Sequence, residues 1–531
     1  MFFPLVVLIA VLPGLVALNA WDLTPPGPWW GLRGLAILEG YVLDQVPDAA
    51  SISSVQEAAA YRTIAYQPPL YAWLESIGFW LSSERSPLAG VLPSYIAGGI
   101  VVVLVYLHGR LWRGGGLGLT AALLVGFNHE LLLRLQVASP TTLALAGALA
   151  SLLCYGWHER TIAESAGPWP WAGPKFWAVA GGVALGLSLL SMAWFGLLVI
   201  PIVILHQAYL RAGLPRVAGP QTLPIPASTS RWAWIKPFWR ERQSLLHGLI
   251  GLGMAAAVAL PWHLMMFHAH GWESYYALLA ASFESRMVDR PDTGLISRLI
   301  DLAPASVPLA IFGAARSIRQ ALIYEDNSPE ATSGALWVIW LSVAAIAPNL
   351  WPGAPQATLD LFLLIPLSLL AAQAVADLVN RRLPVRSLTI LAPATAACVA
   401  WWVSLSLREA FDDLLHGQAS AATALGLHLA LDLLLVLVIL TRKINQWGRR
   451  RDDRQRLILA VFLIAILVIT ITAGTREIWF RHKETHELLT LRTAILRRNR
   501  ERPFNLVAVV GPEWLLSTAR NATGKPEARP E

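Results

Sequence analysis

The chain has 531 residues, of which 55% are hydrophobic and only 14% are charged, against about 25% charged in an ordinary globular protein. Its mean hydropathy is +0.52. This composition excludes a cytosolic enzyme, a disulfide-stapled secreted domain and a coiled coil, and it predicts a polytopic membrane protein. The formal charge is +7 at pH 7. Because much of that excess lies in short blocks between apolar runs, it indicates membrane orientation, and we expect no nucleic-acid partner.

Apolar runs that approach or reach the length needed to cross a bilayer, about 20 residues, recur along the chain. They fall at 2–20, 88–107, 117–135, 140–157, 176–210, 246–267, 299–315, 333–351, 358–378, 387–407, 421–441 and 456–474. The run 176–210 has room for two short helices with a break near Ser191–Met192. The shorter stretch Pro69–Leu81 fits either a thin membrane helix or an interfacial one. The sequence therefore predicts an all-α polytopic membrane protein with about 13 transmembrane helices (12–14).

Arginine and lysine in the short loops predict the orientation of the chain. Basic blocks occupy the linker 207–245 and the loops 379–386 and 442–456, so we expect these three segments to be cytoplasmic. A long first outer loop at 20–67 and a second outer loop at 268–298 then lie on the opposite face.

Two parts of unequal size follow from this topology. The membrane domain spans 1–474, and we expect Met1–Ala20 to be its uncleaved first helix, because no basic segment precedes it. The remainder, 475–531, is predicted to be a small soluble extracytoplasmic tail with one buried strand at Phe504–Gly511 and a partly disordered end. The tail is basic, and the preference of basic segments for the cytoplasm would by itself place it inside. We give more weight to the denser basic block at 442–456, which puts the tail, one helix later, outside.

The first outer loop ends in the segment 66–74, which reads YQPPLYAWL. Proline is tolerated in the first turn of a helix, since its missing N–H would be unpaired there anyway. The pair Pro68-Pro69 therefore predicts a helix that starts at the membrane surface, and Tyr71 suits the aromatic belt of the interface. A capped interfacial helix with no further role explains the same pattern.

A first helix, a long outer loop and then this proline-led helix resemble the GT-C superfamily of glycosyltransferases. The likeness is greatest to the bacterial branch related to lipid A aminoarabinose transferase and the protein O-mannosyltransferases. Further matches follow in the same order over roughly residues 1–380. They are Arg33–Gly40 (RGLAILEG), Gly182–Leu190 (GVALGLSLL), Leu260–His263 (LPWH), His270–Trp272 (HGW), Glu284–Arg286 (ESR) and Pro366.

The resemblance implies an integral membrane glycosyltransferase that takes a sugar from a polyprenyl-phosphate donor and passes it to a lipid, glycan or protein acceptor. It implies a multi-pass protein of the cell (inner or plasma) membrane of a bacterium, surrounded by membrane lipids and with its active site facing outward. It also implies that Gln67, Pro68, Pro69 and Tyr71 line the substrate site.

The sequence departs from the pattern of these enzymes where they carry acids. Gly27-Pro28 precedes the aromatic pair Trp29-Trp30, where an acidic residue is usual, and Ser139 stands five residues after Arg134, where a further acid is usual. The segment 353–360 (GAPQATLD) replaces a basic-plus-tyrosine signature. Two alternatives therefore stay open. One is a non-catalytic GT-C scaffold or lipid-binding protein that has lost the acids, and the other is a transporter, which would need charges deep in several helices.

Glycosyl transfer from a lipid phosphate needs a carboxylate that takes the proton of the acceptor hydroxyl or holds a divalent cation. In the first outer loop, Asp22 is the carboxylate nearest to the missing acids, so we expect it to be catalytic. Glu39 and Asp44 are the next catalytic candidates. An ordinary polar residue at the end of a transmembrane helix is the alternative interpretation of Asp22.

The second outer loop offers charged groups for the phosphate of the donor. Arg286 and Arg290 are candidate phosphate ligands, because the planar guanidinium matches phosphate oxygens, although both also suit a lipid headgroup. Asp289 and Asp292 are weak candidates for holding a divalent cation, Mg²⁺ or Mn²⁺, since two acids without a third ligand also fit a solvated turn. Apart from this candidate divalent cation, the sequence identifies no cofactor.

One acid and one base lie inside an apolar run. Glu130 and Arg134 stand at i and i+4, a spacing that lets the two side chains pair across one helical turn. Ionisable residues within a membrane segment indicate a functional site, and mutual neutralisation is the simpler explanation.

Overall fold

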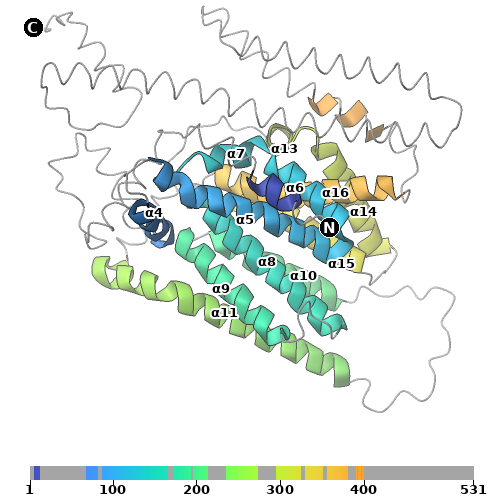
Figure 1. Ribbon diagram of the computed structural model, residues 1–531. Coiled ribbons are helices and arrows are strands. Elements are labelled where there is room, and N and C mark those ends of the chain that lie inside the picture. Colours follow the sequence, from blue (N-terminus) through green and yellow to red (C-terminus); the bar gives the residue numbers. More distant parts are fainter. Residues whose placement is uncertain are drawn as a thin grey trace, which may run out of the picture.

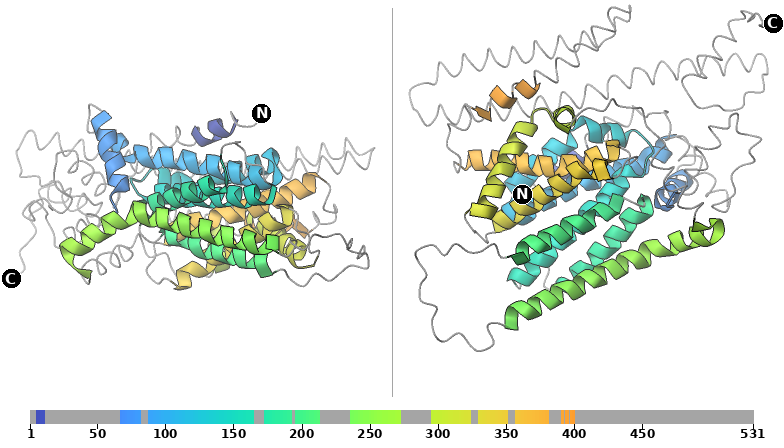
Figure 2. Two further views of the ribbon diagram at one scale, coloured as in Figure 1. Left: turned by 90° about the horizontal axis from the view of Figure 1, so that it is seen from below. Right: turned by 180° about the vertical axis from the view of Figure 1, so that it is seen from behind.

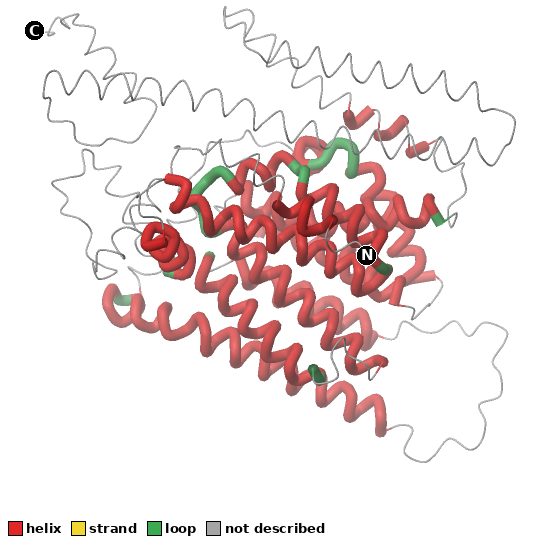
Figure 3. Tube along the Cα trace, viewed as in Figure 1, coloured by secondary structure: helices red, strands yellow, loops and turns green. Residues whose placement is uncertain are grey.

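A computed structural model describes residues 5–11, 67–81, 87–164, 172–192, 195–212, 235–272, 295–323, 329–350, 356–380 and parts of 390–399. Within these ranges the chain is helical, with short turns between helices (Figures 1 and 3). The helices that carry labels are α4 (Leu70–Leu81), α5 (Pro87–Arg113), α6 (Gly115–Gly126), α7 (His129–Leu135), α8 (Thr141–Glu164), α9 (Pro174–Ser191), η2 (Phe195–Leu198), α10 (Val199–Ala212), α11 (Ile235–His270), α13 (Leu295–Leu302), α14 (Val307–Ile323), α15 (Pro329–Leu350) and α16 (Gln356–Val379).

The helices form one bundle in which sequence neighbours pack on one another. Helix α8 packs against α5 and α9, and α11 packs against the far side of α9, at the edge of the bundle (Figure 2). Helix α16 packs against α14, α15 and α6. Of the apolar part of α16, 89% is buried inside the protein, against 22% for α11. Helix α16 is therefore the central helix of the described bundle, and α11 presents an apolar face to its surroundings.

Four described helices are long and apolar enough to cross a membrane. If each of two bent helix pairs counts as one further span, the described residues contain six candidate spans. The four are found in Ala89–Arg113, Pro174–Ser191, Ser244–Ala269 and Leu359–Val379. These helices confirm the all-α polytopic class. The number of about 13 spans stays a prediction, because the runs 421–441 and 456–474 lie outside the described residues.

Two of the predicted single helices are wrong in shape. The run 117–135 is divided into α6 and α7, which meet at 63°, and the run 299–315 is divided between α13 and α14, which meet at 114°. Both runs are continuous in hydropathy, so hydropathy alone does not reveal the bends. The predicted break in 176–210 is confirmed, since α9 ends at Ser191.

Two of the predicted connections, the linker 207–245 and the second outer loop 268–298, are shorter than the sequence indicated. Helix α10 continues to Ala212 and α11 begins at Ile235, so helix occupies both ends of the predicted linker 207–245. At the second outer loop, 268–298, α11 ends at His270 and α13 begins at Leu295. The tail 475–531 lies outside the described residues.

Small residues let α9 and α11 approach closely. A Cβ at Gly182 would collide with the backbone carbonyl of Gly251, and one at Gly186 would lie 2.6 Å from Cβ of Val258. Glycines spaced four apart on one helix face are typical of close helix packing in membranes. The glycine-rich segment of α9 is therefore explained by its packing on α11.

Candidate functional site

The bend between α6 and α7 is built around Asn128. Its side-chain oxygen accepts a hydrogen bond from the backbone N–H of Glu130 at 3.0 Å, so Asn128 is the N-cap of α7. Its side-chain amide donates to the backbone carbonyl of Leu302 at 2.8 Å. Leu302 ends α13 at the second bend. One buried side chain thus joins the two broken helices of the bundle.

Helix α7 carries the first ion pair of this region. Nε and Nη2 of Arg134 both donate to Oε1 of Glu130, at 3.2 and 3.0 Å. The Glu130 side chain is 2% exposed and that of Arg134 is 12% exposed. The sequence prediction of an i, i+4 pair is confirmed, and both charges are held on a single helical turn.

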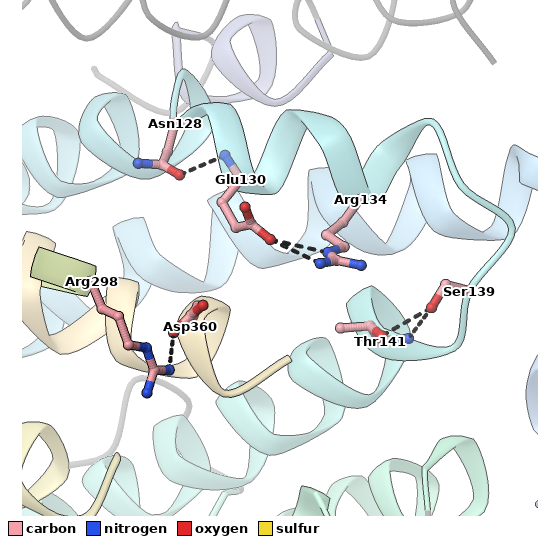
Figure 4. Close-up of polar contacts among 7 residues, drawn as sticks. All are labelled: Asn128, Glu130, Arg134, Ser139, Thr141, Arg298 and Asp360. Carbon is pink, nitrogen blue, oxygen red and sulfur yellow. Dashed lines mark hydrogen bonds and ion pairs between the residues drawn. The ribbon is translucent and has the colours of Figure 1, made fainter. Parts of the chain in front are cut away.

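A second ion pair joins two elements that are far apart in the sequence. Nη2 of Arg298, on α13, donates to Oδ1 of Asp360, in the first turn of the buried part of α16. Their side chains are 15% and 9% exposed. Figure 4 shows this pair facing the same region as Glu130 and Arg134, and α7 contacts α16. The bends therefore bring two carboxylates and two arginines to one end of the bundle.

Burying four charges is expensive unless they are paired. Glu130, Arg134, Arg298 and Asp360 sum to zero charge, and each carboxylate accepts from an arginine. Such groups inside a membrane domain are typical of functional sites. We call these four residues the charged cluster.

Helix α4 is anchored next to this end of the bundle by a chain of hydroxyl groups. The phenol of Tyr71 lies 2.7 Å from Oγ of Ser94 on α5, and it donates to the carbonyl of Gly90 at 3.2 Å. Oγ of Ser94 also lies 3.0 Å from the carbonyl of Val137 and 3.2 Å from that of Ser139, in the turn before α8, and its one proton can be donated to either. Tyr71 thus fixes α4 to α5 and, through Ser94, to the turn that follows α7.

Ser139 is the residue at which the sequence resemblance leads us to expect an acid. Its hydroxyl lies 2.9 Å from Oγ1 of Thr141, and its backbone N–H points to Oγ of Ser94 at 3.4 Å. This position therefore holds a neutral hydrogen-bonded turn at the start of α8 (Figure 4).

The predicted start of the proline-led helix is confirmed. Helix α4 begins at Leu70, and the backbone N–H of Trp73 bonds the carbonyl of Pro69 at 2.9 Å. Pro68 and Pro69 are buried and Gln67 is half-buried. The predicted place of Tyr71 in the aromatic belt of the interface is wrong, because its side chain is fully buried and contacts Gly90 and Ser94 of α5. Whether these four residues bind a substrate stays a prediction.

The remaining predicted site residues lie outside the described residues. They are the catalytic candidates Asp22, Glu39 and Asp44, the phosphate candidates Arg286 and Arg290, and the cation candidates Asp289 and Asp292. Within the part of the chain that the structure describes, no group of three or more His, Cys, Asp or Glu side chains is arranged to hold a metal ion. A divalent cation therefore remains a prediction for the second outer loop.

Sequence reasoning missed Asn128, Arg298 and Asp360 as members of one site. Asp360 and Arg298 are 62 positions apart, and Asn128 and Leu302 are 174 apart. The available signal was a charged residue at the edge of an apolar run, which marks a functional position in a membrane domain. No local spacing rule pairs such residues across the chain.

No protein-family model matches the sequence, and no curated protein matches it. Solved structures do match. The crystal structure of ArnT from Cupriavidus metallidurans bound to undecaprenyl phosphate has a TM-score of 0.56 at 14% identity, over 90% of this chain and 77% of that one. Its apo form gives 0.55 at 16% identity over the same shares. The oligosaccharyltransferase of Archaeoglobus fulgidus gives 0.41 at 14% identity, over 88% of this chain and 55% of that one.

The ArnT pair identifies the architecture of the bundle. The fold is that of the GT-C glycosyltransferases. The resemblance inferred from the proline-led helix and the ordered short motifs is thereby confirmed at the level of fold. The charged cluster and the α4 anchor are features of this chain within the GT-C fold.

Proposed function

We propose that this protein is an integral membrane glycosyltransferase that transfers a sugar from a polyprenyl-phosphate donor to a lipid, glycan or protein acceptor. The observation that carries the proposal is the charged cluster, which sits at the bends of two broken helices inside a GT-C fold. The ArnT structure of the same fold was solved with undecaprenyl phosphate, the same chemical class of ligand.

The cluster has the groups that this reaction requires. When the lipid phosphate departs as the leaving group, cationic groups must stabilise the negative charge that develops on it. Arg134 and Arg298 are partly exposed arginines of this region. Arginine binds phosphate oxygens in the same forked geometry as it binds a carboxylate. The reaction also needs a carboxylate as proton acceptor, and Glu130 and Asp360 add two to those predicted in the first outer loop.

An outward-facing site in the cell membrane of a bacterium is part of this proposal. It rests on the basic blocks that we assign to the cytoplasm. It also rests on Arg298, which is the last residue of the predicted second outer loop, 268–298, and lies on α13. Polyprenyl-phosphate sugars and membrane lipids are then the partners of this end.

A second function, lipid-phosphate binding without turnover, is favoured by one observation. Ser139 has a hydroxyl where similar enzymes carry an acid, and it is fully engaged in a neutral hydrogen-bonded turn. A protein that kept the arginines and lost the catalytic acid would bind a polyprenyl phosphate and release nothing.

Purified full-length protein in lipid nanodiscs separates the two functions. A panel of undecaprenyl-phosphate sugars is added with a membrane extract as acceptor source, and the release of undecaprenyl phosphate is followed by mass spectrometry. Release that depends on the protein supports transfer. Saturable binding of undecaprenyl phosphate with no release from any donor would replace transfer by the binding function.

A further inference from the structure

The ion pair between Arg298 and Asp360 differs from the pair on α7 in how it is held. Glu130 and Arg134 are held one helical turn apart on the same helix, whereas Arg298 and Asp360 come from α13 and α16. Asp360 is also more exposed than Glu130, with 9% of its side chain accessible against 2%. Of the two pairs, the one between Arg298 and Asp360 is therefore the easier to separate.

We propose that the sugar donor displaces Asp360 from Arg298, and that the released Asp360 takes the proton of the acceptor hydroxyl. This inference rests on the proposed glycosyl transfer. It assigns to Asp360 the proton-acceptor role that the sequence prediction gave to Asp22, so the two assignments make opposite predictions for the same pair of variants.

The displacement follows from the chemistry of the guanidinium group. A phosphodiester oxygen and a carboxylate oxygen compete for the same N–H groups of Arg298. Once the phosphate holds Arg298, the carboxylate of Asp360 no longer accepts a hydrogen bond from that guanidinium and is still mostly buried. A carboxylate in that position gains stability by taking up a proton. Donor binding thus creates the base that the transfer needs.

The transfer step balances in atoms and charge. The acceptor oxygen forms a bond to the anomeric carbon of the sugar, and the bond from that carbon to the phosphate oxygen breaks with its electron pair on the phosphate. The acceptor proton moves to Asp360. Before the step the donor phosphodiester, Asp360 and Arg298 sum to one negative charge. Afterwards the dianionic lipid phosphate, neutral Asp360 and Arg298 give the same sum, and Arg298 faces the charge that develops.

Asp360→Asn tests the proposal because it keeps the shape and removes the charge. Transfer in nanodiscs is expected to fall about 10²- to 10⁴-fold, as for loss of a general base. Undecaprenyl phosphate is expected to bind about tenfold more tightly, because it displaces a neutral amide in place of a charged partner. If the ion pair is purely structural, Asp360→Asn should bind undecaprenyl phosphate more weakly than the wild-type protein does, because Arg298 would no longer be held in place by Asp360.

Asp377→Asn is the matched control. Asp377 is a buried aspartate on the same helix, α16, and Oδ2 lies 2.9 Å from Nε of Arg316 and 3.9 Å from Nη1 of Arg113. Its variant makes the same chemical change at a different arginine cluster. It is expected to keep both transfer and lipid binding when corrected for the amount of folded protein.

A second variant covers failure of Asp360→Asn to fold. The double change Arg298→Met with Asp360→Leu removes both charges of the pair together, a replacement that proteins often tolerate. The folded double variant is expected to show no transfer above background. Transfer at near wild-type rates by Asp360→Asn or by the double variant overturns the inference and leaves the proposed function standing. The same holds if Asp22→Asn loses transfer while Asp360→Asn keeps it. If the wild-type protein releases no lipid phosphate, the proposed function fails and the inference falls with it.

Discussion

Asn128 and Leu302 are joined by a 2.8 Å hydrogen bond from the side-chain amide of Asn128 to the backbone carbonyl of Leu302. Because Asn128 also caps α7, one side chain sets both the bend before Glu130 and the position of α13, which carries Arg298. The two ion pairs of the charged cluster are thus positioned relative to each other by a residue that carries no charge.

Replacing Asn128 with alanine is therefore expected to lower the stability of the protein. The helix cap contributes about 1 kcal/mol, and leaving the buried carbonyl of Leu302 without its donor costs roughly 1–3 kcal/mol more. Asn128→Ser keeps a capping oxygen and loses the reach to Leu302, so its effect should be intermediate. Thermal unfolding in detergent measures both. Equal unfolding temperatures for the wild-type protein and the alanine variant would contradict this role.

Replacing Gly182 with valine is expected to disrupt the packing of α9 on α11. The new Cβ would meet the backbone carbonyl of Gly251, which cannot move without shifting its helix. The expected result is a lower unfolding temperature and a smaller monodisperse fraction in size-exclusion chromatography. Gly253→Val is the control on α11, since no described atom lies within 4 Å of a Cβ there. Equal losses for both variants would show that helix propensity, not packing, causes the effect.

Replacing Pro68 and Pro69 together with alanine should lower transfer while the protein stays in the membrane. Both prolines are buried directly before α4, where they limit the conformations that lead into the helix. Tyr71→Phe is the companion variant, because it removes only the hydroxyl that meets Ser94 at 2.7 Å. Membrane fractionation and the lipid-phosphate release assay together give the result. Unchanged turnover in the double variant would leave these prolines with a capping role alone.

The predicted orientation is tested by reporter fusions at Gly219 and Gly511. The basic linker 207–245 is expected in the cytoplasm and the tail 475–531 outside, so an alkaline phosphatase reporter should be active only at Gly511. If the reporter is active at both positions or at neither, the two segments lie on the same side of the membrane and one of the two assignments is wrong.

The fold was predictable from the sequence where local chemistry decides it. A proline pair fixes the start of α4, the i, i+4 spacing fixes the pair of Glu130 and Arg134, and the apolar runs give the helices. The bend at Asn128 was missed because hydropathy is continuous across it, although asparagine is a strong capping residue.

The site was less accessible from sequence than the fold. Asp360 and Arg298 come from α16 and α13, and α13 meets α14 at a bend of 114° that the continuous hydropathy of the run 299–315 does not reveal. A tertiary contact at that bend, from Asn128 to Leu302, joins residues 174 positions apart. The residues predicted from resemblance, Asp22 above all, lie outside the described residues, so their roles stay predictions.

The release of undecaprenyl phosphate from an undecaprenyl-phosphate sugar by the purified protein in nanodiscs tests the central claim most directly. The wild-type protein is expected to release lipid phosphate in proportion to the sugar that reaches the acceptor, and Asp360→Asn is expected to bind the lipid and release almost none. A wild-type protein that binds undecaprenyl phosphate and releases none from any donor in the panel would contradict the account.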